Sequence, residues 1–329
     1  FKPGVYSGLT QSIHMRSSGA FNGFISVRPA TVADGLSAEE AGDGRVTLDF
    51  SDMEFLGTNR GIQIECNYVH WYGIDVCGAG DNGLYIAGSY NIVENCEFYN
   101  NRDTGLQLGR MQSSDTTIDL WPSFNLVKNC TSHNNYDNET YGENADGFAA
   151  KLTVGYGNVF DGCIAYRNSD DGWDLYAKSE SGNIGQVIIY NSVAYENGYL
   201  EYDQRTCNRM YSTWDGTYSE GNIQKDGTTV VENDEKYGKN SFNTRDGDGN
   251  GFKLGGSVME GDVLVYNCLS FANKMHGVTD NSNPGFIKVE NVTSFDNGAA
   301  VDDNPASQTF GQIIDSKNPD ECNNIDLAR

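Results

Sequence analysis

Aspartates and one lysine stand beside glycine in three short segments of the chain. Segments 144–151, 170–174 and 249–256 contribute the carboxylates of Asp146, Asp170, Asp171 and Asp174 and the amine of Lys253. Carboxylates gathered on one patch repel one another and raise their own pKa values unless a cation neutralises them. Such a density of hard oxygen ligands indicates Ca²⁺, which accepts six to eight oxygens at flexible angles. A nearby cation disfavours the ammonium form of a lysine, so Lys253 is a candidate general base.

A plainer interpretation exists for each of these residues. Asp-Gly pairs often form turns, which accounts for Asp146 and Asp171 but leaves Asp174 unexplained. Most surface lysines are simply solvated, whereas Lys253 occupies the same repeat position as Asp174. The shared position is the reason to prefer the chemical interpretation.

A repeated strand pattern must position these residues. A polar residue, a glycine and an alternating segment recur, with the glycines at Gly83, Gly105, Gly147, Gly172, Gly251 and Gly277. The first and third residues after each glycine are apolar except at Asp280, so alternation points them inward and the second residue outward. Successive glycines are 22, 42, 25, 79 and 26 residues apart. The short steps suit one coil of a parallel β-helix.

Asparagine and cysteine recur in the same register. One series comprises Asn95, Asn129, Asn191, Asn267 and Asn291, with Gly162 in the equivalent place, and a second lies six residues later at Asn101, Asn135, Asn168, Asn197, Asn273 and Asn297. Stacked asparagine side chains hydrogen-bond along such an axis, which predicts a structural role for both series. Cys96, Cys130, Cys163 and Cys268 share an inward position and are expected to pack as small apolar groups. Cys207 and Cys322 have no repeat partner and could pair.

The register also predicts distances. Adjacent coils lie about 4.8 Å apart, so Lys253 should lie about 5 Å from Asp174 on the neighbouring coil. Asp146 and Asp171 precede the glycine on successive coils, with Asp170 alongside. Two lengthened connections, 136–145 and 198–249, enter at one loop position, and insertions of this kind are expected to wall a cleft.

Composition sets the broad class. Abundant glycine, with 39 residues, and scarce proline, with 6, favour short strands joined by tight turns, so we expect an all-β chain, 1–329, forming a single parallel β-helix domain. The net charge of −24 argues against nucleic acid or an anionic membrane as a partner. No apolar stretch approaches a membrane span, and the first residues lack the features of a signal peptide, as expected of a mature or trimmed chain. A monomer is expected.

The three acidic and basic segments resemble pectate lyases of polysaccharide lyase family 9. The resemblance covers roughly residues 60–300. It implies a right-handed parallel β-helix, one catalytic Ca²⁺, and β-elimination of polygalacturonate, an acidic plant cell-wall polysaccharide, with secretion following from that function. Carried over by motif, the calcium ligands would be Asp146, Asp170, Asp171 and Asp174, and Lys253 would be the Brønsted base.

The resemblance leaves the substrate open. Some members of the family resemble rhamnogalacturonan lyases, which use the same base and ion on another backbone. The insertion 198–249 looks longer than the plain pattern needs and carries Arg205, Arg209, Trp214 and Arg245. Arginines pair with carboxylates and aromatic rings pack on sugar faces, so these four are candidate substrate-binding residues, although loop stability would also account for them.

Two other classes of protein compete with a lyase. A polygalacturonase-like hydrolase needs carboxylates at an inverting separation and leaves Lys253 without a role. A binding-only solenoid would use calcium as a structural staple. Both remain alternatives at this point.

Overall fold

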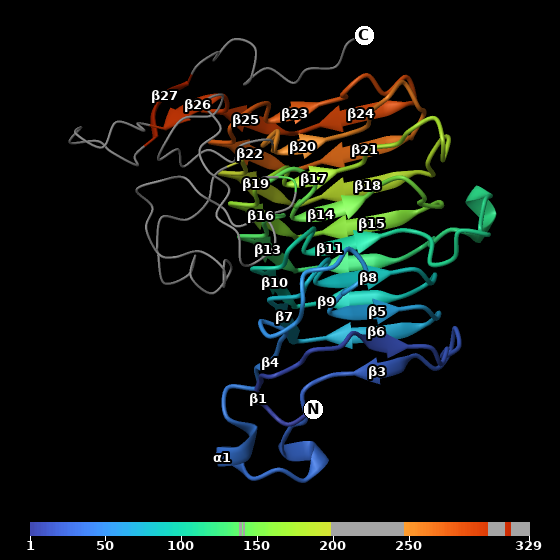
Figure 1. The fold of residues 1–329 in the computed structure, drawn as a ribbon, viewed down its shortest axis with the longest axis vertical. Coiled ribbons are helices and arrows are strands. Elements are labelled where there is room, and N and C mark those ends of the chain that lie inside the picture. Colours follow the sequence, from blue (N-terminus) through green and yellow to red (C-terminus); the bar gives the residue numbers. More distant parts are fainter. Residues whose placement is uncertain (138–139, 141, 199–246, 302–312, 317–329) are drawn as a thin grey trace.

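A stack of coils along one long axis makes up the molecule (Figure 1). The computed structural model describes residues 1–137, 140, 142–198, 247–301 and 313–316. Each complete coil contributes one strand to each of three parallel sheets, because the strand order in every sheet advances by three. The expected all-β parallel β-helix is therefore confirmed.

Three parallel sheets line the coils. Sheet 1 contains β1 (Gly4–Tyr6), β4 (Val46–Asp49), β7 (Ile74–Cys77), β10 (Glu97–Tyr99), β13 (Thr131–His133), β16 (Ile164–Tyr166), β19 (Val193–Tyr195), β22 (Leu269–Phe271) and β25 (Thr293–Phe295). Sheet 2 contains β2 (Ile13–Met15), β5 (Ile62–Ile64), β8 (Leu84–Ile86), β11 (Leu106–Leu108), β14 (Phe148–Ala150), β17 (Trp173–Asp174), β20 (Phe252–Lys253) and β23 (Val278–Thr279). Sheet 3 contains β3 (Ile25–Val27), β6 (Val69–Tyr72), β9 (Ile92–Glu94), β12 (Leu126–Lys128), β15 (Asn158–Asp161), β18 (Val187–Tyr190), β21 (Val263–Tyr266) and β24 (Ile287–Glu290).

Helical segments are short and lie outside the coils' sheets. In the part of the chain that the structure describes, they are η1 (Val32–Asp34), α1 (Ala38–Ala41) and η2 (Ile118–Leu120). Near the C-terminal end, β26 (Ala299–Val301) and β27 (Ile313–Ser316) form a separate antiparallel pair.

The glycine-led repeat forms sheet 2, the sheet that carries the candidate site. Its inward residues, such as Leu106 and Trp173, are fully buried in the apolar core, as the alternation predicts. The outward residues are less exposed than expected: Asp174 retains 3% of its accessible surface and Lys253 retains 8%. The outward direction therefore does not make these two side chains solvent-exposed, and charged side chains of the site lie against both of them.

The second asparagine series forms a continuous ladder of buried side chains. Asn101 donates through Nδ2 to Asn135 Oδ1 at 3.0 Å, and the pattern continues to Asn168 at 2.7 Å. The remaining steps, through Asn197 and Asn273 to Asn297, span 3.0, 2.9 and 2.8 Å. A shorter ladder, outside the two predicted asparagine series, joins Asn125 to Asn158 at 2.9 Å. Each rung satisfies an amide that would otherwise be buried without a partner.

Asparagine recurs in the first series mainly because of the backbone conformation of the turn. Asn95 and Asn129 have φ values of 56° and 51°, and Gly162 at the equivalent place has 67°. Asparagine and glycine tolerate this left-handed backbone better than other residues, so the turn itself selects them. Stacking contributes in part of the series, since Asn291 Nδ2 donates to Asn267 Oδ1 at 2.7 Å.

The inward cysteines behave as predicted. Cys96, Cys130, Cys163 and Cys268 are buried, and none of these four forms a disulfide. Cys207 and Cys322 lie outside the described residues, so their pairing stays a prediction.

Candidate metal and catalytic site

Three neighbouring strands of sheet 2 carry the site. Phe148 in β14 pairs with Trp173 in β17, and Asp174 in β17 pairs with Lys253 in β20. The backbone N–H of Asp171 donates to Asp146 Oδ1 at 3.2 Å, which joins the residues preceding the two glycines. The coil register inferred from the repeats is thus confirmed, and it brings together side chains far apart in the chain.

One acidic group comprises Asp146, Asp171 and Asp174. A carboxylate oxygen from each lies within 4.8 Å of the other two. All three side chains are buried, and burial raises the pKa of both Asp146 and Asp171 well above the usual aspartate range. Neighbouring carboxylates raise these pKa values further, while lysine ammonium groups act in the opposite direction.

A second acidic group shares Asp171 with the first and adds Asp170 and Asp248. Backbone N–H groups of Asn144 and Asp248 donate to the two oxygens of Asp170, at 2.9 and 2.6 Å. The predicted four aspartates therefore fall into two overlapping groups, and Asp248 is a member that the sequence reasoning missed. Asp248 lies at the end of the insertion 198–249 and belongs to no repeat position, so no periodic signal could have identified it.

Lys253 extends its amine between the two acidic groups. Its Nζ lies 3.0 Å from Asp171 Oδ2, 3.3 Å from Asp248 Oδ2 and 3.8 Å from Asp174 Oδ1. Burial disfavours the charged amine, but the surrounding carboxylates outweigh that effect and raise the pKa of Lys253 above its ordinary value. We expected a lowered pKa from a neighbouring cation, and the protein's own carboxylates act in the opposite direction.

Lys151 is a second buried amine in the site. Its Nζ donates to Asp146 Oδ2 at 2.6 Å and lies 3.4 Å from Asp174 Oδ2. Desolvation lowers its pKa, but the charges of Asp146 and Asp174 outweigh this and raise it. Lys151 belongs to the segment 144–151, but its role was missed because it lies just beyond β14, where the alternation no longer predicts its direction.

Of the two lengthened connections, the structure describes a contact with the site for the first, 136–145. Asn144, in 136–145, contacts the site directly: its carbonyl oxygen accepts from Lys151 Nζ at 3.2 Å. Most of 198–249 lies outside the described residues, as do the candidate substrate-binding residues Arg205, Arg209, Trp214 and Arg245. Their contact with substrate stays a prediction.

The donor set fits a hard divalent cation. Its oxygens are carboxylates, the ligand type that Ca²⁺ prefers. Asp171 Oδ2 is buried and receives no hydrogen bond of good geometry, although the Lys253 amine lies 3.0 Å away. Such an oxygen is suited to bind a cation. Two ammonium groups also compensate the cluster, so carboxylate repulsion alone does not require an ion, contrary to the expectation from the sequence.

The fold and site together define a polysaccharide-lyase-like parallel β-helix. A family model described as Pel9A-like, right-handed β-helix region matches residues 1–213 and 205–309. A pectate lyase L from Paenibacillus polymyxa (strain SC2) is 47% identical over 257 residues, covering 78% of this chain and 48% of that protein. The chain therefore belongs to the Pel9A-like family, polysaccharide lyase family 9, as its motifs indicated.

Solved structures agree with this assignment. The crystal structure of pectate lyase Pel9A is 31% identical, with a TM-score of 0.66, over 94% of this chain and 63% of the other. A rhamnogalacturonan lyase at 23% identity and a TM-score of 0.59, over 88% of this chain and 63% of the other, shares the fold. This chain spans about half the length of its Paenibacillus relative. Among the described residues, no helix combines the length and apolarity needed to cross a membrane.

Proposed function

We propose that this chain is the catalytic β-helix of a calcium-dependent pectate lyase that cleaves polygalacturonate to unsaturated products. The observation that carries the proposal is the position of the Lys253 amine, 3.0 Å from Asp171 and beside both acidic groups. The pectate lyases among its relatives support the same reaction class. A hydrolase would need only carboxylates and would leave this buried lysine without a catalytic function.

Each catalytic step is assigned to this chain's own residues. In a 4-linked uronate, the C5 proton lies α to a carboxylate, and neutral Lys253 Nζ accepts it. The electron pair of the C5–H bond becomes the C4–C5 double bond, and O4 leaves with the pair of the C4–O4 bond. A Ca²⁺ ion held by Asp146, Asp170, Asp171 and Asp174 would neutralise the substrate carboxylate, acidify C5 and lower the pKa of Lys253.

Rhamnogalacturonan is the alternative substrate. The same base and carboxylates act on any 4-linked uronate, so chemistry alone does not discriminate between the two polymers. The insertion 198–249, with Arg205, Arg209, Trp214 and Arg245, is proposed to contact the substrate and to set this preference.

We further propose that 1–329 acts as one secreted, monomeric domain, because its substrate is an extracellular polymer. A non-catalytic calcium-stabilised solenoid is the remaining alternative.

Ultraviolet absorbance of the unsaturated product tests the proposal. Polygalacturonate and rhamnogalacturonan are offered side by side, with calcium and with a chelator. With polygalacturonate, we expect the absorbance to rise when calcium is present and not when the chelator is present. The Lys253→Ala variant should give no rise in absorbance in either condition. Lys288→Ala removes a lysine from sheet 3 and serves as the matched control. Cleavage without an increase in absorbance would indicate hydrolysis, and no cleavage of either polymer would favour a binding solenoid.

A further inference from the structure

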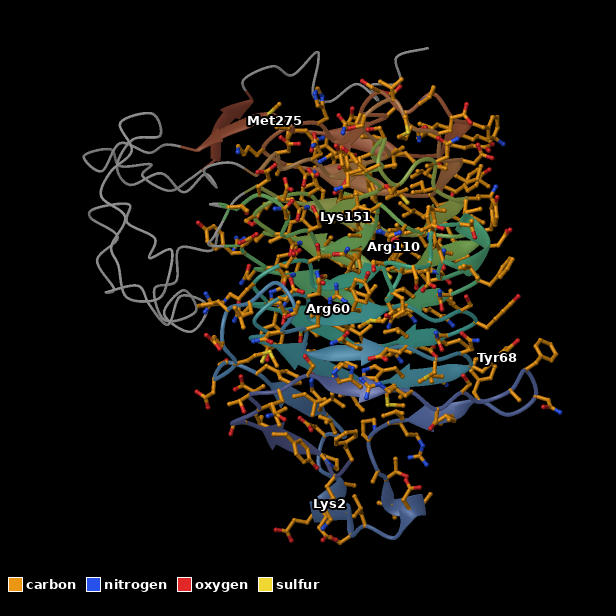
Figure 2. The ribbon with its side chains drawn as sticks, turned by 45° about the vertical axis from the view of Figure 1, so that its right-hand side comes forward. Lys2, Arg60, Tyr68, Arg110, Lys151 and Met275 are labelled. Carbon is orange, nitrogen blue, oxygen red and sulfur yellow. The ribbon has the colours of Figure 1, made fainter. Side chains whose placement is uncertain are left out.

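A row of positively charged side chains continues along sheet 2 from the site toward the N-terminal coils. Arg60, Arg110 and Lys151 follow one another along the long axis on the same side of the molecule (Figure 2). Arg60 precedes β5, Arg110 follows β11 and Lys151 follows β14. The protein carries a net charge of −24, so a polyanion must be held by local cations of this kind.

Direct contacts join this row to the candidate site. The Arg60 guanidinium carbon lies 3.5 Å from the centroid of the Tyr85 ring, and Tyr85 Oη donates to the Arg110 carbonyl at 2.9 Å. The Arg110 N–H donates in turn to Thr153 Oγ1 at 3.0 Å. Thr153 lies two residues beyond Lys151, whose amine contacts Asp146. The segments that carry the two arginines are therefore connected, coil by coil, to the segment that carries Lys151.

The local structure holds the Arg60 guanidinium in place. Stacking on Tyr85 is a cation–π contact, and Asp81 Oδ2 accepts from Arg60 Nε at 3.3 Å. Tyr85 is itself buried, and Gly109 makes room for it, because a Cβ at position 109 would lie 2.4 Å from Tyr85 Oη. A stacked guanidinium pre-organises its fork of donors for a carboxylate.

The guanidinium of Arg110 is also held in place. Its Nη1 donates to the carbonyl of Asp115 at 3.1 Å, within the connection that leads to η2. No carboxylate of the described residues forms an ion pair with Arg110, in contrast to the ion pair between Arg60 and Asp81. Arg110 therefore presents a net positive charge, and Arg60, at another height along the sheet, presents a guanidinium that Asp81 contacts at Nε.

We propose that Arg60 and Arg110 bind carboxylates of the acidic polysaccharide that the site cleaves, several sugar residues from the scissile bond. The proposal rests on the proposed function and extends it. Arg110 follows β11, about two coil steps or roughly 10 Å from β17, and the Arg60 guanidinium packs on Tyr85 of β8, about three steps or roughly 14 Å from β17. A chain along sheet 2 must be long to reach both arginines, so they favour polymer over short oligomers.

Kinetics on substrates of different length test this assignment. Arg60→Gln, Arg110→Gln and the double variant are compared with Lys288→Gln, which removes one positive charge from sheet 3. On polygalacturonate we expect each arginine variant to raise KM about threefold to tenfold with kcat within twofold. On trigalacturonate Arg60→Gln should behave as wild type, and Lys288→Gln should do so on both substrates.

Further measurements distinguish the effect of a lost charge from a loss of fold and from a failure of the proposed function. Thermal unfolding identifies a variant that has lost its fold, and Arg60→Lys keeps the charge, so it should retain more polymer affinity than Arg60→Gln. Equal KM values for wild type and the double variant on polygalacturonate would overturn the subsite. So would an equal loss on trigalacturonate and polymer. Wild-type protein that yields no unsaturated product would refute the proposed function instead, which keeps the two failures distinct.

Discussion

Asp174 and Lys253 are register partners on neighbouring strands, and the Lys253 amine lies 3.8 Å from Asp174 Oδ1. Both side chains are buried, so their charges interact strongly and neither is easily removed alone. The proposed base is therefore also a structural counter-charge. Stability and chemistry are therefore coupled at this position.

Replacing Lys253 should separate its two roles. Lys253→Ala should lower kcat about 10²–10⁴-fold, because the positioned base is lost. It should also lower the free energy of unfolding by about 1–3 kcal/mol, because Asp171 loses its ammonium partner. Product absorbance and denaturant unfolding measure the two effects. Lys253→Arg should restore stability but little activity, since guanidinium stays protonated. Near wild-type turnover in Lys253→Ala would exclude it as the base.

Calcium should be required for activity but not for the coil structure. The apolar core of the helix does not involve the acidic groups, so chelation should abolish turnover while the circular dichroism β signal persists. Asp171→Asn should weaken calcium affinity more than Asp248→Asn, because Asp171 belongs to both acidic groups. Isothermal titration of calcium measures this order. Cooperative loss of the β signal on chelation would make the ion structural.

The two asparagine series should respond differently to substitution. Asn168 both donates and accepts within the buried ladder, so Asn168→Ala should cost about 1–3 kcal/mol of unfolding free energy. Asn129→Gly should cost under about 0.5 kcal/mol, because glycine adopts its positive φ readily, as Gly162 does. Denaturant unfolding compares the two variants. Equal losses would show that the turn position depends on side-chain stacking after all.

Asp81 should make stability depend on pH. Burial and the nearby Asp103 raise its pKa to about 7, from 3.8, so the folded chain binds more protons than the unfolded chain between those values. Stability from this group is therefore lost as pH rises from about 4 to 7. Asp81→Asn stays neutral and should be more stable than wild type by about 1–3 kcal/mol at pH 8, with no advantage at pH 4. Parallel unfolding curves at both pH values, with calcium constant, decide the question.

Much of the architecture follows from the sequence because a solenoid repeats itself. Each coil contacts mainly its neighbours, so the spacing of glycine, asparagine and cysteine determines strand order, and the short strand spacing turns register into distance. Asp146, Asp171, Asp174 and Lys253 could be placed near one another for that reason. The ladder from Asn101 to Asn297 follows from the same periodicity.

Only the tertiary structure decided which residues outside the repeat join the site and how the charges there affect one another. Asp248 joins the acidic groups from a segment without a repeat, and Lys151 turns toward Asp146 after its strand has ended. The burial of Lys253 and the direction of its pKa depend on the loops and charges that surround sheet 2. Electrostatic interactions sum over every neighbour in space, whereas a repeat specifies only the neighbours in register. The repeat in the sequence determined which residues in register meet, and the folded chain determined which others join them and how their charges balance.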